Sequence, residues 1–565
     1  MNTQQQRSTL FHGGTVWPGK GLGDTHALLV RDGLIAALGT DAVQQAKDID
    51  HEAIDLDGGF LMPGFGEGHS HPIHGGLENY GPKLVGLASV EAIVAEVRRY
   101  AEENPDEEWI QGVAYNGSLA EGGLFDARWL DEGVSDRPVV LRGWDGHTLW
   151  CNSEALRRAS ITKDTPEPEM GEIPRRADGE PLGVLREWGA LDLMAAVCPP
   201  PAFEVRLNAL ATALDMFSSF GITWAQESWA ELDNYKVYIE AARRGLLKVR
   251  MNIALIADPR HFPGSLQEML AAREEVRALN HPNLTFNTIK FFADGVIENE
   301  TASLLDPYCT VEHHGMRIWE PAELSKAVAA VRAEGFQPYI HAIGDDAVRI
   351  SLDAMEHSAH FTDAAAARPV VTHVQLASDK DLARFAELGV VANMQPLWAQ
   401  LDALMTVLTI PRLGRERADT QYKTRTLAES GARLAFGSDW PASSADPREG
   451  IAIAASRTTT DGDPDGGWVP EQIIGIEDAL DIYTRGTAFQ GFADAHPAPW
   501  GTLAPGHSAD LVWLGQDPRT AAPAELPGNP VIATYLAGQA TYANDNVNEY
   551  VNDSDHEGQP SHVAQ

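Results

Sequence analysis

The sequence predicts an α/β protein: a (β/α)8 TIM-like barrel, a small β-sandwich domain formed by both termini, and an insertion after the first barrel strand. Three observations lead to this prediction. Apolar strand-like runs alternate with amphipathic helical patterns through the middle of the chain. Short strand patterns occur near both ends. A stretch richer in Gly, Pro and charged residues, at about 75–200, separates the first strand from the rest.

The alternation is clearest in the second half of the chain. FNTIKFFADG, QPYIHAIGD, PVVTHVQL and VVANMQP have the composition of strands, and ELSKAVAAVRAEG, DAVRISLDAMEHSA and DKDLARFAELG have helical periodicity between them. His341 and His373 each end a strand, and about the length of one βα unit separates them. This spacing predicts successive parallel strands of one barrel.

The two ends of the chain share a second pattern. LFHGGTVWPG, HALLVRDGLIAALG and IDLDGGFLMPG near the start, and GTLAPGHSADLVWLG and VIATYLAGQATY near the end, are apolar runs broken by turn residues. We therefore expect residues 1–64 and 495–545 to form a composite β-sandwich domain, flanking a barrel over 65–494. The polar stretch 546–565 is predicted to be disordered.

Composition excludes several classes of partner. The net charge of −38 argues against nucleic acid and anionic membranes, which are polyanions. No apolar run is long enough to span a bilayer, and the first residues lack the pattern of a signal peptide. Three scattered cysteines do not suggest a disulfide framework. We expect a cytoplasmic protein that acts on a small-molecule substrate. Its oligomeric state is open, with a homodimer as one common arrangement for large barrels.

The strongest local signal is LMPGFGEGHSHP. A strand ends in His69-Ser70-His71, and the two-residue period of a strand places both imidazoles on one face. Two histidines on one strand face can hold one ion, because imidazole is a common ligand of zinc. The alternative is a pair of polar histidines at a turn.

Further groups of the same chemistry end later strands. Lys290 lies inside an otherwise apolar strand, where a charged amine is costly and its pKa is lowered. Such an amine can add carbon dioxide and become an anionic carbamate ligand, although a lysine that extends to the strand end is the simpler interpretation. His341, His373 and Asp439 also end strands. Together with the histidine pair they predict a site at the carboxyl end of the barrel.

On these stretches the chain resembles the amidohydrolase superfamily, and within it amidohydrolase family 3, the YtcJ-like branch. The matching stretches are PGFGEGHSHP, DRPVVLRGWDGHTLWCNSEAL, GEIPRRADGEPLGVLRE, GITWAQES, IKFFADGVIENETASLLDPY, HAIGDDAV, FGSDWP and GTLAPGHSADLVWL. They cover the chain from about residue 10 to 543. Two departures are Glu67, where many members have Asp, and VIENETA, where small residues are more usual.

The resemblance implies a metal centre that activates a water molecule for hydrolysis. Its implied ligands are His69, His71, Lys290 as N6-carboxylysine, His341, His373 and Asp439. Asp439 would also be the catalytic proton carrier. One or two divalent ions are implied, with zinc as the default, while iron, manganese or cobalt suit the same ligands.

Four further residues are candidates for substrate binding. Asp145 and His147 lie in LRGWDGHTLW, which forms either a loop over the substrate or a structural turn with its tryptophans in the core. Trp398 either lines the pocket or packs in the core. Tyr422 either reaches the pocket or starts an exposed helix.

Three functions remain open from the sequence. The first is hydrolysis of a non-peptide carbon–nitrogen bond, in a linear amide or N-substituted formamide, with ester or carbamate hydrolysis as a variant. The second is decarboxylation or isomerisation at the same metal site. The third is metal binding without catalysis, against which the complete ligand set argues.

Overall fold

The computed structural model describes residues 8–359 and 364–544. Its largest sheet has eight strands whose neighbours all pair in parallel. In spatial order they are β7 (Phe65–Ser70), β12 (Ile222–Ala230), β13 (Arg250–Ile256), β14 (Leu284–Phe292), β15 (Gln337–Ala342), β16 (Val370–His373), β17 (Val391–Met394) and β18 (Arg433–Phe436). The spatial order follows the chain order, so the predicted (β/α)8 barrel is confirmed.

Hydrogen bonds from the residues just after β18 close the barrel. The Asp439 N–H donates to the carbonyl of His69 at 2.7 Å, and the His71 N–H donates to the carbonyl of Trp440 at 2.9 Å. Ser70 and Trp440 form an isolated parallel bridge. The seam between the first and last strands is thus made by two segments that carry predicted site residues.

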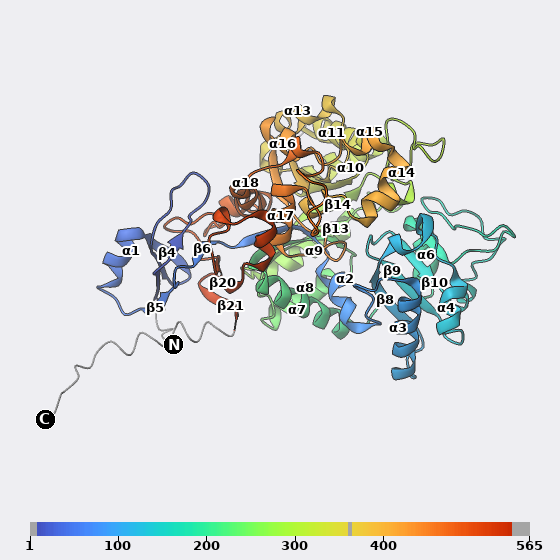
Figure 1. The fold of residues 1–565 in the computed structure, drawn as a ribbon, viewed down its shortest axis with the longest axis horizontal. Coiled ribbons are helices and arrows are strands. Elements are labelled where there is room, and N and C mark those ends of the chain that lie inside the picture. Colours follow the sequence, from blue (N-terminus) through green and yellow to red (C-terminus); the bar gives the residue numbers. More distant parts are fainter. Residues whose placement is uncertain (1–7, 360–363, 545–565) are drawn as a thin grey trace.

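Helices between the strands cover the outside of the barrel (Figure 1). In α10 (Pro321–Ala333), Leu324, Val328 and Val331 are buried, which is the periodicity of a helix with one apolar face. The other covering helices are α7 (Phe203–Ser219), α8 (Tyr235–Arg243), α9 (Leu266–Leu279), α11 (Asp345–Ala359), α13 (Asp379–Glu387), α16 (Thr424–Glu429) and α17 (Pro447–Ser456).

Two smaller sheets form the predicted β-sandwich at one end of the molecule (Figure 1). One has the order β4-β3-β1-β5, from β1 (Ser8–His12), β3 (Leu28–Arg31), β4 (Leu34–Leu38) and β5 (Glu52–Asp55). The other has the order β2-β6-β19-β20-β21, from β2 (Thr15–Val16), β6 (Phe60–Pro63), β19 (Leu511–Leu514), β20 (Val531–Leu536) and β21 (Gln539–Ala543). Phe11 and Tyr535 pack edge to face in the core that the two sheets share. The second sheet therefore combines both ends of the chain, as predicted.

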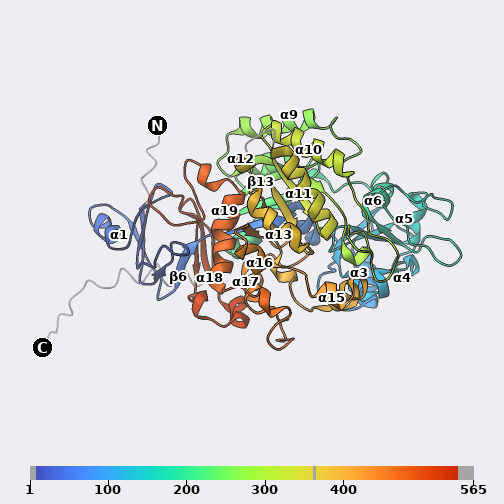
Figure 2. The same cartoon turned by 90° about the horizontal axis from the view of Figure 1, so that it is seen from above.

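The insertion after β7 is a folded unit at the opposite end of the molecule from the sandwich (Figures 1 and 2). Its sheet has the order β11-β10-β9-β8 and a core of its own that includes Tyr115, Phe125 and Trp150. The elements are α3 (Val90–Glu103), β8 (Ile110–Tyr115), α4 (Ala127–Gly133), β9 (Val139–Gly143), β10 (Thr148–Cys151), α5 (Ser153–Arg158), β11 (Val184–Arg186) and α6 (Glu187–Ala195). Trp150 lies in this core, whereas Trp144 lines the cavity described below.

The predicted disordered stretch 546–565 lies outside the described residues. Within the described part of the chain, we find no helix of sufficient length and apolarity to cross a membrane.

Candidate active site

A cavity of about 1190 Å³ lies between the carboxyl ends of the barrel strands and the insertion. All six predicted metal ligands line it: His69, His71, Lys290, His341, His373 and Asp439. The four residues predicted to bind substrate line it too: Asp145, His147, Trp398 and Tyr422. The barrel thus brings together residues that are hundreds of positions apart, at the end where barrels of this kind carry their sites.

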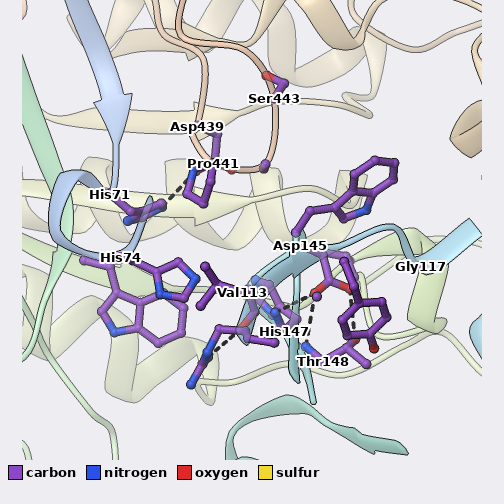
Figure 3. A pocket seen from close by; sticks show the side chains of 18 of the residues that line it. His71, His74, Val113, Gly117, Asp145, His147, Thr148, Asp439, Pro441 and Ser443 are labelled. Carbon is purple, nitrogen blue, oxygen red and sulfur yellow. Dashed lines mark hydrogen bonds and ion pairs between the residues drawn. The ribbon is translucent and has the colours of Figure 1, made fainter. Parts of the chain in front are cut away.

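His69, His71 and Asp439 form the tightest group. Nε2 of His71 lies 2.8 Å from Oδ1 of Asp439, and Nε2 of His69 lies 3.2 Å from the same oxygen. One ligand atom from each residue falls within 4.8 Å of the others, so the group could hold a metal ion. Figure 3 shows the side chains of His71 and Asp439 pointing toward each other, with a dashed line for this contact.

The hydrogen bonds of His69 indicate its tautomer. Its Nδ1 lies 2.7 Å from the hydroxyl of Tyr339 and 2.8 Å from that of Thr372. Both hydroxyls donate to other oxygens, so each must accept from a proton on Nδ1. Burial, together with the Lys290 charge, lowers the pKa of His69 well below its usual value, so the ring is neutral. Its Nε2 lone pair therefore points at a carboxylate oxygen, an arrangement that a cation between them would stabilise.

His71 is in an electronegative environment. Burial lowers its pKa, but the carboxylates of Asp439 and Glu227 outweigh burial and raise the pKa of His71 to about 9. Oε1 of Glu227 lies 3.6 Å from Nδ1 of His71. The same two carboxylates that attract a proton here would also attract a metal cation.

His341 and His373 form a second pair, with ring centroids 4.6 Å apart. Nδ1 of His341 lies 3.2 Å from Oδ1 of Asp294, and Nδ1 of His373 lies 2.8 Å from Oε1 of Gln395. Burial lowers the pKa of both rings, that of His373 to about 3. Histidines that donate from one nitrogen to a fixed acceptor leave the other free, as metal-binding histidines do.

Lys290 has a buried amine without a hydrogen-bond partner among the described residues. Its side chain is fully buried in β14, and among the described residues Nζ has no hydrogen-bond partner. Nζ lies 4.7 Å from the ring centroid of Phe292 and 5.0 Å from that of Tyr339. Burial lowers the pKa of Lys290 to about 7, which leaves much of the amine neutral and nucleophilic near neutral pH. The position therefore suits an amine that adds carbon dioxide and then ligates metal.

The backbone at the site is strained in two places. His373 has φ of 74° and Asp439 has φ of 59°, values that non-glycine residues rarely adopt. Glu67 lies beneath and supports the Asp439 loop, because Oε1 accepts from the N–H of His69 at 3.0 Å and of Ser438 at 2.8 Å. Burial raises the pKa of Glu67 to about 8. Glu67, where many family members have Asp, thus connects the segment that carries His69 with the segment that carries Asp439.

The insertion contributes His147 to the cavity (Figure 3). Nδ1 of His147 lies 2.8 Å from Oε2 of Glu187, and its ring centroid lies 5.6 Å from that of His341. Asp145 lines the cavity as well, but its oxygens accept from the backbone N–H groups of His147 and Thr148 and from the Thr148 hydroxyl. Asp145 therefore fixes the turn that positions His147.

Aromatic side chains form much of the remaining wall. Trp398 stacks on the ring of His373, with centroids 5.3 Å apart and planes 5° apart. Tyr422 is buried and lines the same cavity. Trp440, the residue after Asp439, packs against Phe217, with ring centroids 5.6 Å apart.

Some site residues were missed by the sequence argument. One of them is His74, which lies in α2 (Pro72–Gly76) and lines the cavity. Glu187, Asp294 and Gln395 were not singled out, although each accepts from a histidine of the site. Trp229 lines the cavity as well and was not singled out. It lies near the end of β12, the strand that contains most of the motif GITWAQES, and its place at a strand end could have indicated it.

Comparisons with known proteins agree with this geometry. The chain is 28% identical to the putative amidohydrolase YtcJ of Bacillus subtilis, over 94% of this chain and 99% of that protein. It is 26% identical to the N-substituted formamide deformylase of Arthrobacter pascens, over 91% and 94% of the two chains. An uncharacterized metal-dependent hydrolase from Pyrococcus horikoshii has the same fold, with a TM-score of 0.71 at 22% identity, over 91% of this chain and 99% of that one.

A family model described as "Amidohydrolase family" matches residues 52–542. This match spans the barrel and the sandwich strands from β5 onward, including every ligand candidate named above. The chain therefore belongs to the amidohydrolase family and is a hydrolase.

Proposed function

We propose that this protein hydrolyses a non-peptide carbon–nitrogen bond, in a linear amide or an N-substituted formamide, with the help of bound divalent metal. The observation that carries the proposal is the convergence of the six ligand candidates on one cavity. The N-substituted formamide deformylase among its relatives supports the substrate class.

The residues present fit a metal centre. His69, His71 and Asp439 would hold one ion. Lys290, carboxylated on its orphaned amine, would bridge to a second ion held by His341 and His373. A bound divalent cation supplies a Lewis acid that polarises a carbonyl and makes water nucleophilic near neutral pH. Nitrogen and carboxylate ligands suit zinc.

Asp439 is proposed as the catalytic proton carrier. Its Oδ1 faces the two histidines, and a carboxylate at this position can take a proton from the attacking water and pass it to the leaving nitrogen. The aromatic wall that includes Trp229 and Trp398 would hold an apolar substituent of the substrate.

The location and assembly are part of the same proposal. The three cysteines are free, which supports a reducing cytoplasm. A homodimer is proposed as the assembly, and light scattering of the purified protein tests it.

The test is a panel of N-formyl and N-acetyl amines incubated with zinc-loaded protein. We expect amine and carboxylic acid to appear in equal amounts. Release of carbon dioxide without amine would indicate a decarboxylase, and turnover of matched esters but of no amide would indicate an esterase. Either result overturns the proposal.

A further inference from the structure

Arg142 lies one residue before the end of β9 in the insertion and lines the same cavity. Its side chain is half-buried, and Nη1 donates to the carbonyl of Gly146 at 2.9 Å. Across the part of the chain that the structure describes, no carboxylate lies within ion-pair distance of its guanidinium, and the hydrogen bond to Gly146 is the one found. Arg142 therefore presents an unpaired positive charge to the cavity.

An unpaired guanidinium in such a place is costly. Arginine stays charged in proteins, so it cannot escape desolvation by losing its proton. A buried charge is normally paired, as Arg250 is with Asp510 at 2.7 Å. Burial lowers the pKa of Arg142 below its usual value, which reflects the same loss of water. A negatively charged group on a bound molecule would supply the partner that the protein does not.

His74 provides a second unpartnered group on this wall. Among the described residues, its buried Nε2 has no hydrogen-bond partner. His74 lies three residues after His71 and lines the same cavity as Arg142. Burial, and after it the charge of Arg142, lowers the pKa of His74 well below its usual value. His74 from α2 and Arg142 from the insertion therefore line the cavity that also holds the proposed metal ligands, where part of a substrate would rest.

The nearby carboxylates do not replace the missing partner. The oxygens of Asp145 are used within its own turn. Glu231 is exposed to solvent and not within ion-pair distance of Arg142. The chain as a whole is strongly negative, so an anion would be held here only by specific contacts.

We propose that Arg142 binds a carboxylate of the substrate, so that the preferred substrates are N-acyl or N-formyl derivatives of amino acids. A guanidinium can donate two parallel hydrogen bonds to one carboxylate. The N–H groups of Arg142 that do not bond to Gly146 are available for such a pair. This inference rests on the proposed amide hydrolysis for its catalytic consequence, but not for the binding itself.

The first test compares N-formylphenylalanine with N-formylphenylalaninamide, which differ in charge and little in shape. We expect the wild-type holoenzyme to prefer the acid, measured as the ratio of the two kcat/KM values. Arg142→Gln should lower this ratio about 10- to 100-fold, the range for a charge-assisted hydrogen bond. Arg142→Lys, which retains the positive charge, should retain part of the preference for the acid. A ratio that is the same in wild type and Arg142→Gln overturns the proposal.

The second test needs no turnover, so it separates this inference from the proposed function. Calorimetry measures the binding of benzoate and of benzamide to the zinc-loaded wild type and variants. Wild type should bind benzoate more tightly than benzamide, Arg142→Gln should lose this difference, and Arg142→Lys should keep part of it. If benzoate binds equally well to wild type and Arg142→Gln, its carboxylate is held elsewhere and the assignment is wrong.

Discussion

Nε2 of His71 lies 2.8 Å from Oδ1 of Asp439, across the seam where the first and last strands of the barrel meet. His71 follows β7 and Asp439 follows β18, so one contact joins the two ends of the sheet. Backbone hydrogen bonds from the same two segments close that seam. The proposed metal centre therefore lies where the first and last strands of the barrel are held together.

Removal of metal should consequently lower the stability of the whole barrel. A ligand that binds only the folded state at 100 times its Kd stabilises it by about 2.7 kcal/mol. We expect chelation to lower Tm by several degrees and zinc to restore it, measured by calorimetry. His71→Asn removes one ligand of the ion at the seam, so its Tm should change less on chelation than that of the wild type. Equal Tm values for wild type loaded with and stripped of zinc would contradict a metal at this seam.

Lys290 is expected to carry a carboxylate group. Lys290→Ala should lose the second ion and most activity, and propionate should restore part of both by supplying carboxylate oxygens. Metal analysis and a carbon-13 NMR signal from labelled carbon dioxide are the measurements. Lys423→Ala is the control, because that lysine is paired with Asp379 and does not line the cavity. Full activity of Lys290→Ala without propionate would rule out the ligand role.

Asp439→Asn tests the proton carrier. The amide can still contact the two histidines but cannot take up a proton, so we expect kcat to fall about 10²- to 10⁴-fold while much of the metal is retained. Asp446→Asn is the matched control, because Asp446 caps α17 and asparagine caps equally well. Unchanged turnover in Asp439→Asn would remove Asp439 from its proposed role.

Gln395 should set the metal affinity through His373. Gln395→Leu removes the acceptor of the His373 Nδ1–H, and loss of such a partner typically weakens metal binding 10- to 100-fold. Gln395→Glu retains an acceptor and should bind metal more tightly than Gln395→Leu. Competition with a zinc chelator measures both. Equal affinities for the leucine variant and wild type would show that the hydrogen bond does not position this histidine.

The residues that sequence could predict are those placed by strand periodicity. His69 and His71 alternate along one strand, and His341 and His373 end successive strands, so a parallel barrel necessarily brings them to one end. Lys290 was identifiable because a charge inside an apolar strand is unusual. In each case a local pattern is enough, since the barrel repeats the same geometry around its axis.

The partners of these residues follow no such repeat. Glu187 meets His147 across the insertion, from a position with φ of 60° that no spacing rule predicts. His74 enters the cavity because a single short helix follows β7. Whether these side chains reach the site depends on how the insertion packs on the barrel. Local sequence patterns do not show this packing, because it depends on contacts between residues far apart in the chain.

Glu187 should position His147 for contact with the substrate. Its carboxylate accepts from Nδ1 of His147 at 2.8 Å and from the hydroxyl of Thr301 at 2.6 Å, so it joins the insertion to the loop after β14. Glu187→Ala frees the imidazole, and we expect kcat/KM to fall about 10- to 100-fold, mainly through KM. Glu187→Gln still offers an oxygen to Nδ1 and should recover most of this loss. If both variants lose activity equally, the charge of Glu187 rather than its hydrogen bond matters, because only the charge is absent from both.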